Sequence, residues 1–251
     1  FNPAILAAGS EQGFVDFILD GQPEPPMYFA NMKRDNKVGP RVLGELPAPA
    51  QMSAKDFRTI DTKRVAMIDT RPFEAFRAQH IPGSLSFPLM NSFPTHVGSM
   101  VQDTDDIYLI VTQDHLEEVV RDLIRIGLDR IRGWVDASDI EEYPDSVQRM
   151  GGLAEVDASE ASAMIDSGEV QVLDVRRRTE FDLGHLPGAI NIAHTRLPSR
   201  LAEIPKDKRL LVNCHSGVRS AVSCSYLQRA GYQVVNLQGG HLAWRQLVSH
   251  Q

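Results

Sequence analysis

The sequence holds only two cysteines, Cys214 and Cys224, among its 251 residues. Two thiols are too few for the disulfide framework that stabilises small secreted domains, and they are consistent with a reducing cytosol. No apolar run approaches the roughly 18 residues that a membrane span needs, and the N-terminus lacks the basic-then-apolar pattern of a signal peptide. We therefore expect a cytoplasmic chain with no membrane partner.

Positive charge is also scarce. The chain has 26 Lys and Arg against 33 Asp and Glu, a formal net charge of −7, and it has no lysine–arginine run. This balance argues against a nucleic-acid partner and against steering to acidic lipid. Hydrophobic residues make up 42% and charged residues 24% of the chain, which is typical of a globular protein, and the length fits one large domain or two ordinary ones.

An internal repeat decides the expected architecture. A shift of 105 residues aligns Val65–Pro88 with Val170–Ala193, and seven of those 24 positions are identical, where composition alone gives about one or two. The identical pairs are Val65/Val170, Asp69/Asp174, Arg71/Arg176, Phe76/Phe181, His80/His185, Pro82/Pro187 and Gly83/Gly188. The chain is therefore predicted to contain two copies of one domain.

Each copy shows the same order of expected elements. An apolar strand ends at Asp-x-Arg, and a helical stretch leads to a Pro-Gly turn and a second strand. After a connector, two more strands enclose a helix that stops at Gly127 or Gly231. The expected strands are Val65–Ile68, Leu85–Phe87, Ile107–Val111 and Arg130–Ile131, then Val170–Leu173, Ala189–Ile192, Arg209–Val212 and Val234–Leu237. Strands that alternate with helices predict an α/β fold, in which each copy is a mostly parallel, doubly wound sheet flanked by helices.

Ligands of such sheets bind at the carboxyl ends of the strands. In the second copy, the third strand runs into a loop before an expected helix from Ala221 to Ala230. The loop residues are Cys214, His215, Ser216, Gly217, Val218, Arg219 and Ser220. Loop amides and the positive helix end would form an anion cradle and, with the Arg219 cation, would favour a Cys214 thiolate. Ser220 stands where an N-cap belongs.

The second copy resembles a rhodanese domain of the sulfurtransferase family from Val156 to about Leu247. The matching segments are Leu173–Arg176, Glu180–Phe181, Gly184–Asn191, Cys214–Arg219, Asn236–Gly240 and Ala243–Trp244. The resemblance implies that Cys214 carries a sulfane sulfur, that the amides of His215 to Ser220 cradle it, and that Arg219 closes the loop and contacts an anionic donor such as thiosulfate. The related cysteine phosphatases place this arginine one position further on, in a roomier loop, so a phosphatase is the less favoured interpretation.

The first copy resembles the same family at Ile68–Arg71 and His80–Gly83 but departs from it at the loop. The sequence alignment places Gln113 where the second copy has Cys214, and no cysteine occurs before residue 214. We therefore expect the first copy to be inactive.

The N-terminal residues indicate a further relative. The chain begins at Phe1 rather than at a methionine, so we expect a fragment or a processed product. Residues 11–39 are similar to the C-terminal helix and tail of metallo-β-lactamase-fold hydrolases fused to rhodanese pairs, in which the front domain is often a metal-dependent persulfide dioxygenase. The expected domains are a tail of a missing upstream domain at 1–45, an inactive rhodanese-like domain at 46–144 and a catalytic rhodanese domain at 145–251, with a linker that begins at Glu141–Asp145.

The sequence thus predicts a sulfurtransferase that moves a sulfane sulfur from thiosulfate or a persulfide to a thiol through a Cys214 persulfide, without a cofactor or a metal. The alternative is a sulfur-relay or scaffold module that serves an upstream metallo-hydrolase domain and does not turn over free donors. Cys214 could instead be a buried structural cysteine. We expect Cys224 to pack against the sheet, although a disulfide with Cys214 is possible, and we expect Arg176, His80 and His185 to be structural.

Overall fold

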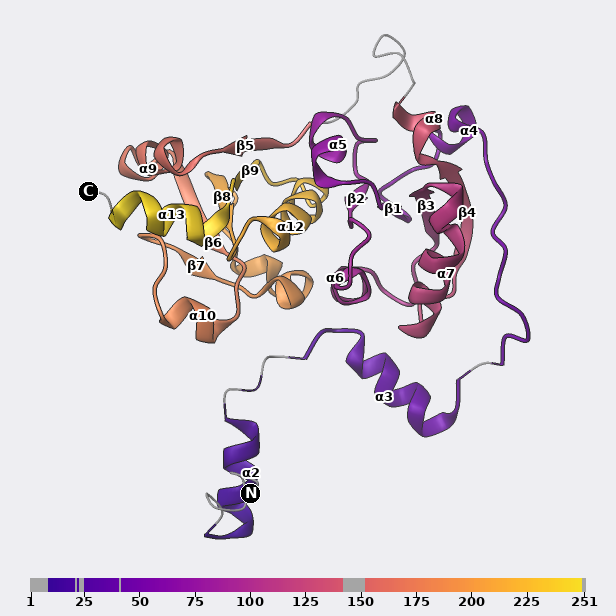
Figure 1. The fold of residues 1–251 in the computed structure, drawn as a ribbon, viewed down its shortest axis with the longest axis horizontal. Helices are drawn as coiled ribbons and strands as arrows, with labels where there is room; N and C mark the ends of the chain where they lie inside the picture. Colours follow the sequence, from indigo (N-terminus) through magenta and orange to yellow (C-terminus); the bar gives the residue numbers. More distant parts are fainter. Residues whose placement is uncertain (1–8, 21, 23–24, 41, 142–151, 250–251) are drawn as a thin grey trace.

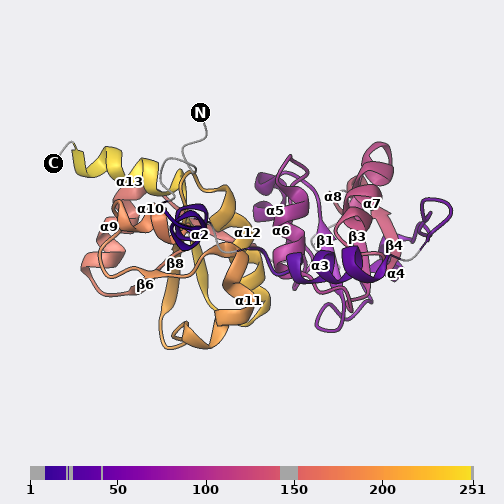
Figure 2. The same cartoon turned by 90° about the horizontal axis from the view of Figure 1, so that it is seen from below.

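The computed structural model describes residues 9–20, 22, 25–40, 42–141 and 152–249, which form two α/β units side by side (Figures 1 and 2). We call residues 46–141 the first unit and residues 152–249 the second unit. The predicted linker begins at Glu141, which the structure places as the last residue of α8 (Ala137–Glu141), and residues 142–151 lie outside the described residues. No helix in the described ranges is long and apolar enough to cross a membrane.

The first unit is a four-stranded parallel sheet with the order β2-β1-β3-β4. Its elements are α4 (Ala54–Phe57), β1 (Ala66–Asp69), α5 (Phe73–Ala78), β2 (Leu85–Ser86), α6 (Phe93–Met100), β3 (Ile107–Val111), η1 (Gln113–His115), α7 (Leu116–Arg125), β4 (Ile131–Asp136) and α8 (Ala137–Glu141). The strand expected at Arg130–Ile131 is therefore longer and begins one residue later. Gly133 interrupts its apolar pattern, which is why the sequence shows only its start.

The second unit is a five-stranded parallel sheet with the order β5-β9-β8-β6-β7. Its elements are β5 (Ala154–Val156), α9 (Ala158–Asp166), β6 (Val170–Asp174), α10 (Arg178–Asp182), β7 (Ile190–Asn191), η2 (His194–Arg196), α11 (Leu197–Arg200), η3 (Leu201–Glu203), β8 (Arg209–Asn213), α12 (Val218–Arg229), β9 (Val234–Leu237) and α13 (Gly240–Ser249). The order β9-β8-β6-β7 repeats the order β4-β3-β1-β2 of the first unit, and β5 is an added edge strand.

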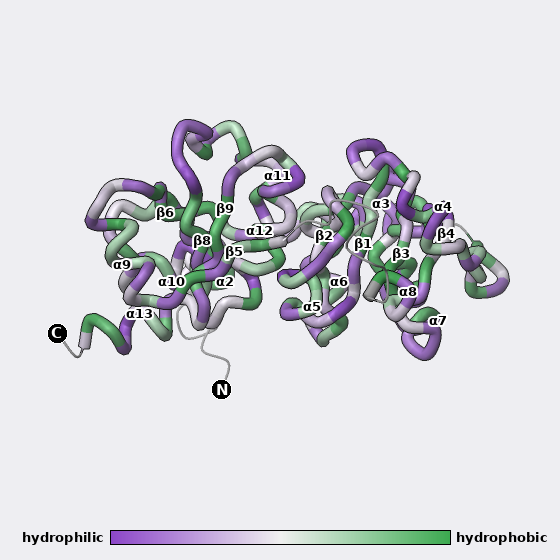
Figure 3. Tube along the Cα trace, turned by 90° about the horizontal axis from the view of Figure 1, so that it is seen from above, coloured by the Kyte–Doolittle hydropathy of each residue, from purple (hydrophilic) through white to green (hydrophobic). Residues whose placement is uncertain are grey.

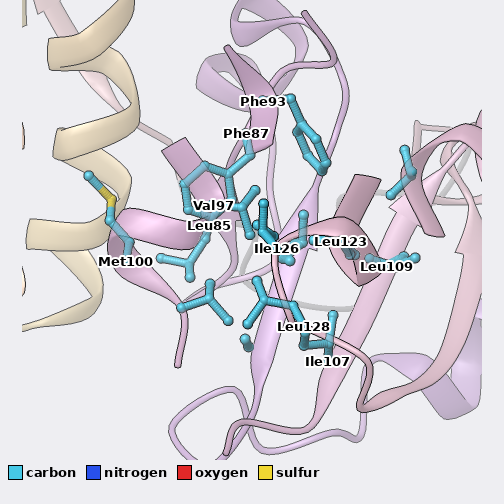
Figure 4. Close-up of a cluster of buried hydrophobic side chains, with 14 of the residues drawn as sticks. Leu85, Phe87, Phe93, Val97, Met100, Ile107, Leu109, Leu123, Ile126 and Leu128 are labelled. Atoms are coloured by element: carbon cyan, nitrogen blue, oxygen red, sulfur yellow. The ribbon is translucent and has the colours of Figure 1, made fainter. Parts of the chain in front are cut away.

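Both faces of each sheet are covered by helices, as the doubly wound prediction requires. In the first unit, Ile68 and Leu109 pack on one side with α6 and α7, while Met67 and Ile110 pack on the other side with α4 and α8. Alternation along a strand sends successive side chains to opposite faces, and here both faces are apolar. Figure 4 shows the larger cluster, and Figure 3 shows apolar residues following the central strands.

Two buried ion pairs repeat at the ends of the equivalent strands. Arg71 Nη2 lies 2.7 Å from Asp69 Oδ2 in the first unit, and Arg176 Nη2 lies 2.6 Å from Asp174 Oδ2 in the second. Each arginine also donates to a backbone carbonyl eight residues on. Removing one partner of such a pair leaves an uncompensated buried charge, so both pairs stabilise the turn after the first strand. The prediction that Arg176 is structural agrees with this geometry.

The two repeated histidines hold the corner between helix and strand. His80 stacks on Phe76 with ring centroids 4.0 Å apart, and His185 stacks on Phe181 at 3.8 Å. Each Nδ1 lies within hydrogen-bond distance of the carbonyl of the phenylalanine on which it stacks. These contacts agree with the structural role predicted for both histidines.

Helix α12 of the second unit packs against β2 of the first unit. Ser225 Oγ accepts a hydrogen bond from the Ser86 amide at 3.0 Å, and Arg229 Nη1 donates to the Gly83 carbonyl at 3.3 Å. The side chain of Val222 belongs to the larger hydrophobic cluster of the first unit, and Phe76 of the first unit belongs to a cluster of the second. The two units therefore share apolar surface.

The N-terminal segment forms two helices, α2 (Glu11–Leu19) and α3 (Phe29–Val38). The first lies in the segment whose resemblance implied a helix, and it is capped by Ser10, whose side chain accepts a hydrogen bond from the Gly13 amide. The second was not predicted, because its sequence is mostly polar. The segment is fixed to the first unit by Tyr28, which is buried there, and by an ion pair from Arg34 to Asp103 at 3.2 Å.

Candidate active site

The loop that follows β8 makes a tight turn into α12. Gly217 is the N-cap of α12 and has a φ of +102°, a left-handed conformation that favours glycine. The helix begins at Val218, three residues earlier than predicted, so the prediction that Ser220 is the N-cap is wrong. The glycine conformation, which local sequence does not reveal, lets the chain enter the helix at once. Ser220 lies inside the first turn, where its hydroxyl donates to the Gly217 carbonyl at 3.0 Å.

The Cys214 thiol is enclosed by this turn. The Gly217 amide donates to Cys214 Sγ at 3.1 Å, and Ser220 Oγ lies 3.5 Å from the same sulfur. Cys214 is only 1% exposed and belongs to the hydrophobic cluster between the sheet and α12. The residue is thus buried, yet a backbone amide at a helix N-terminus points at its sulfur. An amide donor and the helix dipole both stabilise negative charge on that atom.

The start of α13 fixes the backbone of the loop. The His241 amide donates to the Cys214 carbonyl at 2.7 Å, and the Leu242 amide donates to the His215 carbonyl at 3.0 Å. A Cβ at Gly240 would lie 2.5 Å from the Cys214 carbonyl oxygen, and the residue has a φ of +57°. This close approach requires glycine, which explains the Gly239–Gly240 pair at the end of the motif.

Arg219 is paired with a carboxylate of α10. Its Nη1 and Nη2 donate to the two carboxylate oxygens of Glu180, each at 2.7 Å. The side chains are 21% and 29% exposed, so the pair is only partly screened by water. The hydrogen bonds from Arg219 lower the pKa of Glu180 from 4.5 to about 2. The sequence pointed to Glu180 as part of a motif but did not show that it binds Arg219.

The other predicted loop residues form the outer rim. His215, Ser216 and Val218 are exposed, and they lie on the loop that encloses Cys214.

Cys224 is fully buried in α12, both cysteines are free thiols, and burial raises the pKa of Cys224 well above its ordinary value. A buried, protonated thiol in the helix fits the packing role that was predicted for Cys224.

Sequence reasoning missed two histidines at the junction of the units. The rings of His96 in α6 and His194 in η2 meet edge to face with centroids 5.3 Å apart. Burial lowers the pKa of His96 to about 4 and that of His194 to about 3. Within the described part of the chain, neither nitrogen of His194 has a hydrogen-bond partner. The two residues are about a hundred positions apart, and no local pattern connects them.

The equivalent loop of the first unit lacks this arrangement. Strand register aligns Asp69 with Ile110 and Asp174 with Asn213, so Val111 occupies the place of Cys214. The sequence alignment that put Gln113 there is wrong by two residues, because the alignment was not constrained by the strand pairing. Gln113 instead begins the short helix η1. With valine at the equivalent position, this loop has no thiol to act as a nucleophile.

Within the residues that the structure describes, no group of three or more His, Cys, Asp or Glu side chains could hold a metal ion. The geometry of the site is that of a lone cysteine whose sulfur accepts a hydrogen bond from one backbone amide, that of Gly217, and lies 3.5 Å from the Ser220 hydroxyl.

Comparison with known proteins identifies the second unit. Residues 157–247 match the family described as "Rhodanese-like domain". A protein named "Sulfurtransferase" from Allochromatium vinosum is 38% identical over 92 residues, which are 36% of this chain and 86% of that protein. The chain belongs to the rhodanese-like family.

Two further proteins are similar to parts of this chain. "Thiosulfate sulfurtransferase GlpE" from Shewanella oneidensis is 29% identical over 98 residues, 39% of this chain and 97% of that protein. A solved structure of a metallo-beta-lactamase from Staphylococcus aureus is 27% identical, covers 51% of this chain and 34% of its own, and has a TM-score of 0.43. The family match lies in the second unit, which carries Cys214.

Proposed function

We propose that the second unit is a sulfurtransferase that moves a sulfane sulfur from thiosulfate or a persulfide to a thiol through a persulfide on Cys214. The observation that carries the proposal is the Gly217 amide, which points at Cys214 Sγ from the N-terminus of the 12-residue helix α12. The relatives named sulfurtransferases support the reaction class.

The first step loads the cysteine. The Cys214 thiolate attacks the outer sulfur of thiosulfate, a new S–S bond forms, and the old S–S bond breaks with its electron pair leaving on sulfite. The product is a Cys214 persulfide that carries one negative charge. The helix N-terminus, from which the Gly217 amide donates to Cys214 Sγ, stabilises negative charge on the cysteine before the transfer and on its persulfide afterwards.

The second step returns the cysteine to its starting state. An acceptor thiolate attacks the outer sulfur of the persulfide, and the bond between the two sulfurs on Cys214 breaks. The electron pair stays on Cys214 Sγ, and the Gly217 amide again donates a hydrogen bond to the thiolate. No electrons are gained or lost overall, so the cycle needs no cofactor.

We further propose that the first unit is a second rhodanese-like domain that has lost its nucleophile, and that residues 1–45 are the tail of an upstream metallo-β-lactamase-fold domain. The repeated strand order and the repeated Asp–Arg pairs support the first proposal. The sequence resemblance of residues 11–39 supports the second. The proposed boundaries are 1–45, 46–144 and 145–251.

A second candidate function is the relay module, which receives sulfur only from a partner domain. One observation favours it: the cation nearest to an incoming anion, Arg219, is already bound on both nitrogens by Glu180. Steady-state turnover with thiosulfate and cyanide separates the two functions, since sustained turnover supports the enzyme and absence of turnover with these free substrates supports the relay.

Mass spectrometry tests the proposed persulfide. After treatment with thiosulfate, the protein is expected to gain about 32 Da on the peptide that contains Cys214. Cys214→Ser should abolish the gain, whereas the matched variant Cys224→Ala should retain it, because Cys224 is fully buried in α12 and burial keeps its thiol protonated. A gain on Cys224, or none on either cysteine, contradicts the proposal.

A further inference from the structure

A cavity of about 750 Å³ lies between the two units. One wall consists of residues that follow the first-unit strands, among them Leu89, Met90 and Thr112, and the opposite wall includes Gly217, Val218 and Asn236 of the second unit. The carboxyl edge of the inactive sheet thus faces the loop that carries Cys214. A volume of this size suits a small organic molecule.

The cavity touches the proposed reaction centre through Gly217. This residue lines the cavity, and its amide donates to Cys214 Sγ at 3.1 Å. A molecule in the cavity is therefore separated from the reacting sulfur by one residue of the loop. Val218, the next residue, is exposed and lies on the same wall.

The cavity wall carries hydroxyl, amide and carboxylate side chains. Asn236 is 1% exposed, its Nδ2 donates to Glu155 Oε1 at 2.8 Å, and its Oδ1 is buried with no hydrogen-bond partner among the described residues. Glu155 adds a carboxylate beside Asn236, with its Oε2 3.7 Å from Arg77 Nε, and Glu74 adds one on the wall formed by the first unit. The guanidinium of Arg71, which also lines the cavity, is bound by Asp69. A ligand that donates a hydrogen bond to Asn236 Oδ1 would bind favourably, because a buried acceptor without a donor costs free energy of desolvation.

We propose that this cavity binds the acceptor of the sulfur-transfer step, and that the acceptor is a small thiol with an apolar arm and an N–H donor. The inference rests on the proposed function, which it deepens by naming the acceptor class. The apolar wall takes the arm, Asn236 Oδ1 accepts from the N–H group, and Glu74 and Glu155 repel acceptors that carry carboxylates. The acceptor sulfur then takes the outer sulfur of the Cys214 persulfide, and the electron pair of the broken S–S bond stays on Cys214.

This assignment gives the first unit a direct part in the reaction. Its strands end in a crevice where an active copy of the domain would hold its own nucleophile, and Val111 has replaced that residue. The crevice is retained but opens toward the loop of the second unit. The first unit therefore supplies a binding wall and no chemistry.

Discharge of the loaded protein tests the inference. Cys214 is first loaded with thiosulfate and the added mass is verified; the excess donor is then removed, and release of the sulfur is followed with two thiols at equal thiolate concentration. N-acetylcysteamine has an amide N–H and no carboxylate, and mercaptosuccinate has two carboxylates. The wild-type protein should be discharged faster by N-acetylcysteamine.

Two variants locate the effect. Met90→Trp narrows the cavity and should raise the half-saturating concentration of N-acetylcysteamine by about tenfold. A change of this size is expected when a ligand fits a pocket slightly less well. The control Leu183→Trp changes a residue that is 91% exposed on the second unit and should behave as the wild type. Glu74→Lys should shift the preference toward mercaptosuccinate. Equal discharge by both thiols, or identical kinetics for Met90→Trp and Leu183→Trp, overturns the inference.

A binding measurement keeps this inference separate from the proposed function. The S-methyl thioether of N-acetylcysteamine cannot accept sulfur, so its binding to the unloaded protein, followed by NMR titration, does not depend on the chemistry. Chemical shift changes at Leu89 and Asn236 that are weakened in Met90→Trp support the cavity assignment even if Cys214 never loads. Absence of those changes contradicts the cavity assignment even if loading succeeds.

Discussion

Replacing Glu180 by glutamine should destabilise the protein in a pH-dependent way. The pKa of Glu180 is lowered from 4.5 to about 2 by Arg219, and at about 1.4 kcal/mol per pH unit this shift corresponds to roughly 3 kcal/mol. The side chains of the pair are 29% and 21% exposed, and solvent screening reduces the expected loss to about 1–2 kcal/mol. At pH 7, the free energy of unfolding of Glu180→Gln should be lower than that of the wild type by this amount.

The sign of the pH dependence follows from the direction of the shift. Because the pKa of Glu180 is lowered in the folded state, its contribution is complete above the unfolded value of 4.5 and is lost as the pH falls through about 2. The difference in unfolding free energy between the wild type and Glu180→Gln should therefore be constant from pH 7 to pH 5 and should narrow from pH 5 to pH 3.

Urea unfolding at pH 7, 5, 4 and 3 measures this difference. The control is Glu203→Gln, which removes the exposed pair with Arg200, whose side chains are 36% and 51% exposed. Water screens such a surface pair, so Glu203→Gln should leave the unfolding midpoint almost unchanged. An unchanged midpoint for Glu180→Gln at pH 7, or a difference that stays constant down to pH 3, would refute the reasoning.

Three further substitutions test the turn and the junction of the units. Gly217→Ala places a side chain at a φ of +102°, which costs about 1–2 kcal/mol; urea unfolding should show the loss, and thiosulfate loading should slow because the amide moves from Cys214 Sγ. Ser225→Ala leaves the Ser86 amide without its partner and should cost about 1–3 kcal/mol in the same assay. His194→Phe removes a buried imidazole without hydrogen-bond partners and should stabilise the protein. Because burial lowers the pKa of His194 to about 3, the unfolded chain binds the proton first, and the advantage of His194→Phe should grow as the pH falls below about 6.5; an advantage that is independent of pH contradicts this prediction.

Local patterns in the sequence were sufficient to predict most of the sheet. The repeated Asp-x-Arg and His-x-Pro-Gly motifs located β1, β6 and the strands that follow them, because each motif is a contact between near neighbours in the chain. Strand β5 was missed since its three residues, Ala154–Val156, form no apolar run. Edge strands of this length are held by pairing with a distant partner, here β9.

The chemistry of the loop was predictable, but its contacts were not. The position of Cys214 followed from the end of β8, whereas the partner of Arg219 lies 39 positions away in α10. Only the hydrogen-bond register of the two sheets shows that Val111 of the first unit is equivalent to Cys214 of the second. The contact between His96 and His194 depends on how the two units pack, which no pattern within one unit encodes.

Removal of residues 1–140 separates the two proposed roles of the first unit. The contacts that hold Cys214 come from Gly217, Ser220 and His241, all within the second unit. Loading by thiosulfate should therefore persist in the shortened chain, although the exposed surface of α12 should lower its stability and solubility.

The acceptor step should respond differently to this deletion, because one wall of the cavity is lost with the first unit. Discharge should lose its preference for N-acetylcysteamine over mercaptosuccinate and should no longer saturate with N-acetylcysteamine. Circular dichroism establishes whether the shortened chain is folded. A folded product that cannot be loaded would show that the first unit supports Cys214 itself, whereas a folded product that keeps the preference would place the acceptor outside the cavity.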